Sequence, residues 1–135
     1  MKRFLSVLMI MCVLFSLSGC QLMESESVKL RDLEFTILSE DVLPEELKTM
    51  IDERKAAAFK MTYADTEALY ICIGYGEQAT GGYSITLEEL YLAEDAIYVE
   101  TTLLGPDAEA QASKTPSYPY IVIKTEKLDR TVICE

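Results

Sequence analysis

Histidine and tryptophan are both absent from this chain of 135 residues. Without histidine, the sequence has no Ser-His or Cys-His nucleophile pair and lacks the commonest zinc ligand. Neither Cys72 nor Ser84 has an evident general base elsewhere in the pattern. We therefore expect no catalytic residue, no metal site and no cofactor, and interpret the protein as not an enzyme.

Positive charge is also scarce, because 12 basic residues stand against 23 acidic ones and give a net charge of −11. Nucleic acids and anionic lipid headgroups both require a basic surface, so we exclude nucleic-acid binding. The acidic residues Glu88, Glu89, Glu94 and Asp95 lack the spaced oxygen ligands of a calcium loop. We therefore interpret these four acidic residues as a solvated face of a hairpin.

The first twenty residues have the pattern of an export signal. Lys2 and Arg3 precede the apolar stretch 4–17, which is too short for a membrane-spanning helix and ends in Leu-Ser-Gly-Cys20. This ending resembles the lipobox of bacterial lipoproteins, which implies cleavage after residue 19 and a lipid on Cys20, with acyl chains such as palmitate. We expect a protein anchored to the bacterial cell membrane and facing outside the cytoplasm. Loss of Lys2 and Arg3 with the leader would change the net charge from −11 to −13.

Three regions are predicted along the chain: a lipoprotein signal peptide at 1–19, a lipidated polar tether at 20–29 and a single β-rich domain at 30–135. One helix is predicted from Pro44 to Ala57, because Pro44, Glu45 and Glu46 are typical of a helix start and an apolar stripe follows. Alternating or continuous apolar runs predict strands. These runs are 33–38, 58–63, 68–75, 82–92, 96–104, 119–125 and 131–134.

The fold class that follows is mainly β (α+β), an antiparallel β-sandwich or a curved sheet with one helix on the N-terminal side. The stretch 68–75 is apolar at nearly every position, which indicates a central strand. Cys72 lies in that strand and Cys134 is the penultimate residue. Two alternatives stay open for this pair: a disulfide that holds the last strand in the sheet, or two buried free thiols.

A glycine-rich segment at 74–85 joins two of the predicted strands. It lacks the Gly-Lys-Ser/Thr ending and the following helix that a phosphate-binding loop requires. Two interpretations remain, a structural hairpin and an exposed recognition loop held by a rigid sheet. Further along, Tyr91 and Tyr98 are placed to face each other across a predicted hairpin, and could pack there or form part of a binding surface.

The same segment carries a family resemblance. The order Thr80-Gly81-Gly82-Tyr83, a hairpin, a polar loop containing Gln111, and then Pro119 before an apolar strand resembles the PrcB C-terminal domain family over residues 69–124. Thr80, Gly81, Gly82, Tyr83 and Pro119 match the motif of that family. The resemblance implies an accessory lipoprotein that associates with a surface protease, and it makes these five residues the candidate partner-binding site.

We therefore expect a non-enzymatic, lipid-anchored surface protein that binds a protein partner, with a secreted protease as the expected partner that it stabilises or regulates. The alternative is a small-molecule or ion-binding lipoprotein of the cell envelope. A closed apolar pocket would favour this alternative, whereas a solid core with a tyrosine-lined edge would favour partner binding.

Overall fold

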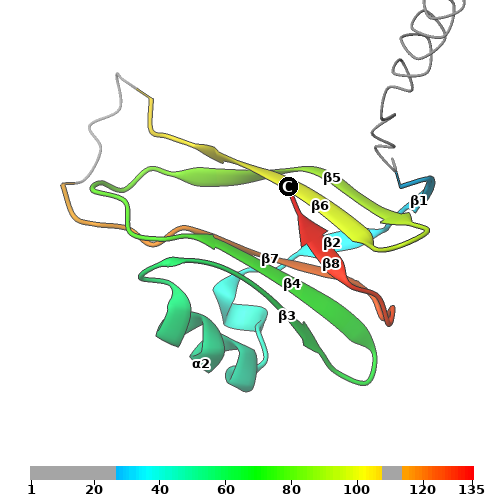
Figure 1. Cartoon of the computed structure of the whole chain (residues 1–135). Helices are drawn as coiled ribbons and strands as arrows, with labels where there is room; N and C mark the ends of the chain where they lie inside the picture. The colour runs from blue at the N-terminus through cyan, green and yellow to red at the C-terminus, as the bar shows by residue number, and fades with distance from the viewer. Residues whose placement is uncertain (1–26, 108–113) are drawn as a thin grey trace, which may run out of the picture.

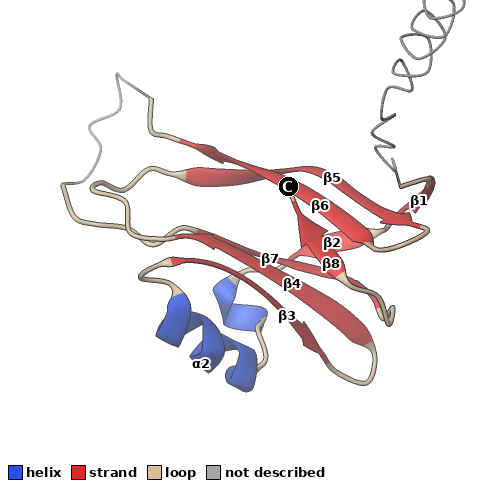
Figure 2. Ribbon diagram, viewed as in Figure 1, coloured by secondary structure: helices blue, strands red, loops and turns tan. Residues whose placement is uncertain are grey.

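The computed structural model describes residues 27–107 and 114–135. Within these ranges the chain forms two four-stranded β-sheets that face each other, and one α-helix lies on the outer side of one sheet (Figure 1, Figure 2). This arrangement confirms the predicted fold class, and of the two predicted forms it is the sandwich. The predicted leader 1–19, the lipidation site Cys20 and Gln111 lie outside the described residues.

The strands form where the sequence has alternating or continuous apolar residues. Their bounds are β1 (Lys29–Asp32), β2 (Phe35–Ile37), β3 (Ala58–Ala64), β4 (Ala68–Tyr75), β5 (Ser84–Ala93), β6 (Ile97–Leu104), β7 (Tyr120–Glu126) and β8 (Val132–Cys134). The predicted strands from residue 58 onward each coincide with one of these. The predicted strand at 33–38 is only partly formed as β2, and β1 was not predicted at all.

Sheet A has the strand order β1-β5-β6-β8, and sheet B has the order β2-β7-β4-β3. Neighbouring strands are antiparallel, except β6 and β8, which are parallel. Since β4 lies between β7 and β3, the predicted central strand is confirmed. β1 and β2 lie on edges of different sheets, so the chain passes from sheet A to sheet B at Leu33 and Glu34.

The main core fills the space between the sheets. Every second residue of β4 contributes to it, with Ile71 fully buried, and Val99 on β6 packs there from sheet A. Burial of each such aliphatic side chain stabilises the fold by about 1.5–3 kcal/mol. The remaining buried members of this cluster are Leu33, Leu69, Ile73, Leu90, Leu92, Ile97, Ile121 and Ile123.

A second core forms between sheet B and the helix α2 (Glu45–Arg54). Leu47 and Ile51 lie one turn apart on α2 and are buried against Tyr70 and Cys72 of β4. The apolar stripe of the predicted helix therefore packs on sheet B. A short 3-10 helix (Glu40–Val42) precedes α2. α2 ends before the predicted Ala57 because the chain turns there, with the Ala57 N–H bonded to the Arg54 carbonyl, to enter β3.

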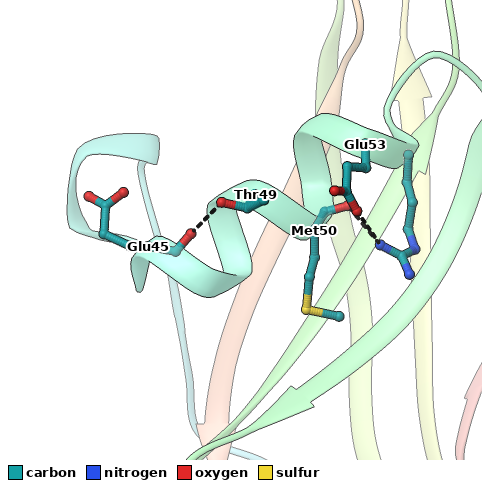
Figure 3. Close-up of polar contacts among 5 residues, drawn as sticks. Glu45, Thr49, Met50 and Glu53 are labelled. Atoms are coloured by element: carbon teal, nitrogen blue, oxygen red, sulfur yellow. Dashed lines mark hydrogen bonds and ion pairs between the residues drawn. The ribbon is translucent and has the colours of Figure 1, made fainter.

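The outer side of α2 carries polar side chains (Figure 3). The Thr49 hydroxyl donates a hydrogen bond of 3.0 Å to the Glu45 carbonyl, and the Arg54 guanidinium donates one of 3.0 Å to the Met50 carbonyl. The Glu53 carboxylate lies 3.9 Å from the Arg54 guanidinium. These contacts stay within the helix, so this side of α2 is an ordinary solvated surface.

Candidate partner-binding site

Two loops cross between the sheets at the same end of the sandwich (Figure 1). The first leads from β4 in sheet B to β5 in sheet A, and the second returns from β6 to β7. Because β4 pairs with β7 and β5 pairs with β6, the four strand ends that carry these loops meet here. We name the described residues 76–83, 105–107 and 114–119 the crossover end. It contains all five residues of the predicted partner-binding site.

Hydrogen bonds join the two loops to each other. The backbones of Gln78 and Ser117 exchange hydrogen bonds, with N···O distances of 2.8 and 3.0 Å. The Ser117 hydroxyl also donates a hydrogen bond of 2.6 Å to the carbonyl oxygen of Thr80. Thr80 is thus held through its backbone, and the loop before β5 has a defined position relative to the loop before β7.

Gly82 has a conformation that only glycine adopts readily. Its φ is +86°, and a Cβ atom at this position would lie 2.9 Å from the Cβ of Pro106 in the opposite loop. A pair of adjacent glycines is typical of a positive φ or a close backbone approach. Gly82 provides both, whereas Gly81 has no positive φ.

Tyr83 and Pro119 lie on different sides of the crossover end. Tyr83 is half-buried, and its ring lies beside the backbone of Gly105, where an added Cβ would be 3.6 Å from the ring. The Pro119 carbonyl accepts a hydrogen bond of 3.1 Å from the Tyr75 N–H, so Pro119 continues the pairing of β4 with β7. Tyr83 therefore fixes the sheet A side, and Pro119 fixes the sheet B side.

Sequence reasoning missed the side-chain hydrogen bonds at and beside this end. The Tyr118 hydroxyl donates a hydrogen bond of 3.1 Å to the Glu77 carboxylate, and this bond is the main reason why the pKa of Tyr118 is raised. The hydroxyls of Tyr75 and Thr101 share a hydrogen bond of 2.7 Å that links sheet B to sheet A. The Tyr-Gly-Glu order at 75–77 was visible in the sequence, but nothing in it showed which loop these side chains would meet.

The two cysteines are free thiols in the structure, so the disulfide alternative is not formed in it. Cys72 belongs to the core beneath α2, whereas Cys134 packs against the core between the sheets. The backbone of β4 therefore lies between the two sulfur atoms. Burial raises the pKa of the Cys72 thiol to about 12, so this thiol stays protonated and unreactive at neutral pH.

The described residues contain no group of three or more acidic or cysteine side chains arranged to hold a metal ion. The predicted interpretation of Glu88, Glu89, Glu94 and Asp95 as a solvated hairpin face agrees with their exposure on β5 and in the turn that follows it. Across 27–107 and 114–135, no helix is both long enough and apolar enough to cross a membrane.

A groove of about 660 Å³ lies away from the crossover end, along β2 and β7. Phe35 and Leu38 supply its apolar surface, and Arg31, Lys124 and Glu126 are among the charged residues that line it. The groove is open to solvent and mixed in polarity. It therefore differs from the closed apolar pocket that would favour a small-molecule carrier.

The chain was compared with known proteins in three ways. Comparison with curated proteins and with solved structures gave no match. A family model described as PrcB C-terminal matches residues 69–126, which run from β4 to the last residue of β7 and include both crossover loops. The resemblance to the PrcB C-terminal family is therefore confirmed over residues 69–126.

Proposed function

We propose that this protein is a non-enzymatic accessory protein that binds a protein partner at the crossover end, and that the partner is a secreted protease which it stabilises or regulates. One observation carries the proposal: the segment matched by the PrcB C-terminal family contains both loops of the crossover end. A match to this family is consistent with an accessory protein of a protease complex.

The crossover end has the physical properties of a recognition surface. Hydrogen bonds hold its backbone at Gln78, Thr80 and Ser117, so these positions have little conformational entropy to lose on binding. Glu77, Gly82 and Tyr118 are exposed on it. Tyrosine combines an apolar ring with a polar hydroxyl and is enriched in protein interfaces.

We further propose that a lipid on Cys20 anchors the protein to the outer side of the cell membrane, and this part of the proposal rests on the sequence. The lipobox-like Leu-Ser-Gly-Cys20 supports a lipid on Cys20, and the polar residues that follow support a tether on the outer side of the cell membrane. A membrane anchor would confine the protein to the surface that a secreted protease crosses. Lipid labelling of the full chain in cells tests this part, because incorporation should be lost in Cys20→Ala.

The alternative function, binding of a small molecule or an ion, has less support. The groove beside Phe35 is open and lined by both charge signs, so a small ligand there would keep much of its contact with water. The family match does not extend to β2, which forms one wall of this groove.

Site-specific crosslinking tests the proposed function. A photo-crosslinking residue in place of Thr80 should capture one secreted peptidase on the native membrane surface. The matched control carries the same residue in place of Glu53, on the solvated side of α2 (Figure 3). Capture from position 80 and not from position 53 would support the proposal. Capture of the same peptidase from both positions would contradict the assignment of the site, and capture of no protein from position 80 would contradict partner binding.

A further inference from the structure

The outer face of sheet A is uncovered in the part of the chain that the structure describes. Both described helices lie on the sheet B side of the sandwich (Figure 1, Figure 2). Residues of β5 and β6 alternate between the core and this outer face, because successive side chains of a strand point to opposite sides. Leu90, Leu92, Ile97 and Val99 belong to the core, so Tyr91 and Tyr98 lie on the outer face.

The two tyrosines form a stacked pair on this face. Their ring centroids are 5.3 Å apart with an angle of 12° between the planes, as their positions across the predicted hairpin suggested. Ile133 of β8 is opposite Tyr98 and 36% exposed. Asp32 of β1 is opposite Tyr91. A row of four residues with an aromatic centre therefore crosses the sheet.

A row of glutamates runs beside this aromatic row. Glu89 of β5 is directly opposite Glu100 of β6. Glu135 follows on the other side of Glu100, because its N–H bonds to the Val99 carbonyl and Cys134 is paired with Val99. The pKa of Tyr91 is raised, first by burial and then by the negative charges of Glu135 and Glu89, as expected if both carboxylates are near the ring.

Opposed carboxylates on neighbouring strands destabilise a sheet. A positive charge would reduce this repulsion between carboxylates, and the same face shows how a cation is held. The Lys29 ammonium lies 5.2 Å from the centre of the Tyr91 ring and 2.5 Å from the Asp32 carboxylate. The face thus already binds one cation through an aromatic ring and a carboxylate. No cation of the described residues is ion-paired with Glu89, Glu100 or Glu135.

From this charge complementarity we propose that the outer face of sheet A is a second docking surface, and that it binds a basic segment of a protein partner. Lys29 already lies at the Tyr91 ring. Arginine or lysine side chains of that segment therefore lie against the ring of Tyr98 and between Glu89, Glu100 and Glu135. The negative charges of this face would repel an anionic membrane surface. This surface is separate from the crossover end and does not depend on the function proposed for it.

Binding of a short synthetic peptide of alternating arginine and glycine to the full chain in neutral detergent tests the proposal. The test variant is Glu89→Gln with Glu100→Gln. The matched control is Glu45→Gln with Glu53→Gln, which removes the same charge from α2 (Figure 3). Changes in the amide chemical shifts of the protein show where the peptide binds. Binding of the same protein to vesicles of anionic lipid is measured for comparison. Unfolding in urea checks that the variants fold, and the loss of opposed charges should leave the test variant at least as stable as the unaltered chain.

We expect the dissociation constant of the peptide to rise about tenfold in the test variant and less than about twofold in the control, with shift changes centred on Tyr91 and Tyr98. A Tyr98→Phe variant should keep most of the affinity, because the ring and not the hydroxyl contacts the cation. An equal loss in both double variants would overturn the proposal, since the peptide would then respond to net charge alone. Preference for anionic vesicles over the peptide would also overturn it.

Discussion

The Ser117 hydroxyl donates a hydrogen bond of 2.6 Å to the carbonyl oxygen of Thr80, 37 residues earlier in the sequence, and so joins the two loops of the crossover end. Because Gln78 and Ser117 also pair through their backbones, the crossover end is held by contacts between the loops as well as by the strands beneath them. The candidate site therefore depends on a side chain that the motif itself does not contain.

Removal of this hydroxyl in Ser117→Ala should lower the free energy of unfolding by about 1 kcal/mol, which is the usual net contribution of one hydrogen bond. Amide hydrogen exchange at 80–83 should become faster. Urea denaturation and exchange measurements check both effects. Ser84→Ala is the matched control, because Ser84 is exposed at the start of β5. Equal stability and exchange in the two variants would show that the Ser117–Thr80 bond does not hold the loops together.

Gly82→Ala should destabilise the protein by about 1–2 kcal/mol, because an alanine at φ +86° is strained and its Cβ would meet Pro106 at 2.9 Å. Gly105→Ala in the opposite loop has no positive φ and would make only an ordinary contact with Tyr83, at 3.6 Å. It should therefore leave stability within about 0.5 kcal/mol of the unaltered protein. Thermal or urea unfolding of both variants decides the matter, and a Gly82→Ala protein as stable as the Gly105→Ala protein would contradict the described loop geometry.

The thiols of Cys72 and Cys134 should remain unbonded in the native protein under mild oxidation, because they lie on opposite sides of β4. A thiol-alkylating reagent should modify Cys134 first and leave Cys72 intact until urea is added, since Cys72 is fully buried. Mass spectrometry of the native and unfolded protein measures this order. An intramolecular disulfide in the native protein, or alkylation of Cys72 at the rate of Cys134, would contradict it.

The free energy of unfolding should fall as the pH rises above about 9, which is the ordinary pKa of a thiol, because burial raises the pKa of Cys72 to about 12 in the folded state. Above pH 9 the unfolded chain releases a proton that the folded protein keeps, so the unfolded state binds fewer protons and stability decreases. Cys72 lowers the free energy of unfolding by at most about 1.4 kcal/mol per pH unit above pH 9. Below pH 9 its contribution to stability is fully present, because the thiol is protonated in both the folded and the unfolded state.

Urea denaturation between pH about 9 and about 10 separates the thiols from the buried Tyr70, whose pKa is also raised but which adds a fall only above its ordinary pKa of 10.0. Burial also raises the pKa of Cys134, so the variants of the two cysteines are needed to separate their effects. Cys72→Ala should flatten the pH dependence while lowering stability at all pH values through the cavity that it leaves. Cys134→Ala serves as the comparison, because its more exposed thiol has a smaller effect. An unchanged slope in Cys72→Ala would show that another group is responsible.

The strands from residue 58 onward could be predicted because their apolar residues alternate or run continuously, and β4 has its predicted bounds of Ala68–Tyr75. β1 (Lys29–Asp32) could not, because all four of its side chains are exposed and its pairing with β5 is set by the backbone. β2 lies within the predicted strand 33–38 but is shorter, and its Phe35 and Ile37 remain about half exposed at the edge of sheet B.

Only part of the candidate site could be predicted from the sequence, because some of its contacts join segments that are far apart along the chain. Thr80–Tyr83 could be identified from the glycine pair and the family motif, and Pro119 from its place before an apolar strand. Ser117, Thr101 and Glu77 enter through contacts between segments far apart in the sequence, which depend on how the two sheets are stacked. The cysteine pair shows the same limit, because the sequence could not tell which face of β4 each sulfur would occupy.

The most direct test of the central claim is a quantitative pull-down of the full chain from the native membrane surface, with crosslinking and mass spectrometry. It compares the unaltered protein with Tyr83→Ala at the crossover end and with Tyr63→Ala, a half-buried tyrosine of β3 on the α2 side. We predict a single secreted peptidase that is retained by Tyr63→Ala and reduced at least about tenfold by Tyr83→Ala, provided that both variants remain folded. Recovery of the same peptidase at equal yield with Tyr83→Ala, or of no protein partner at all, would contradict the account.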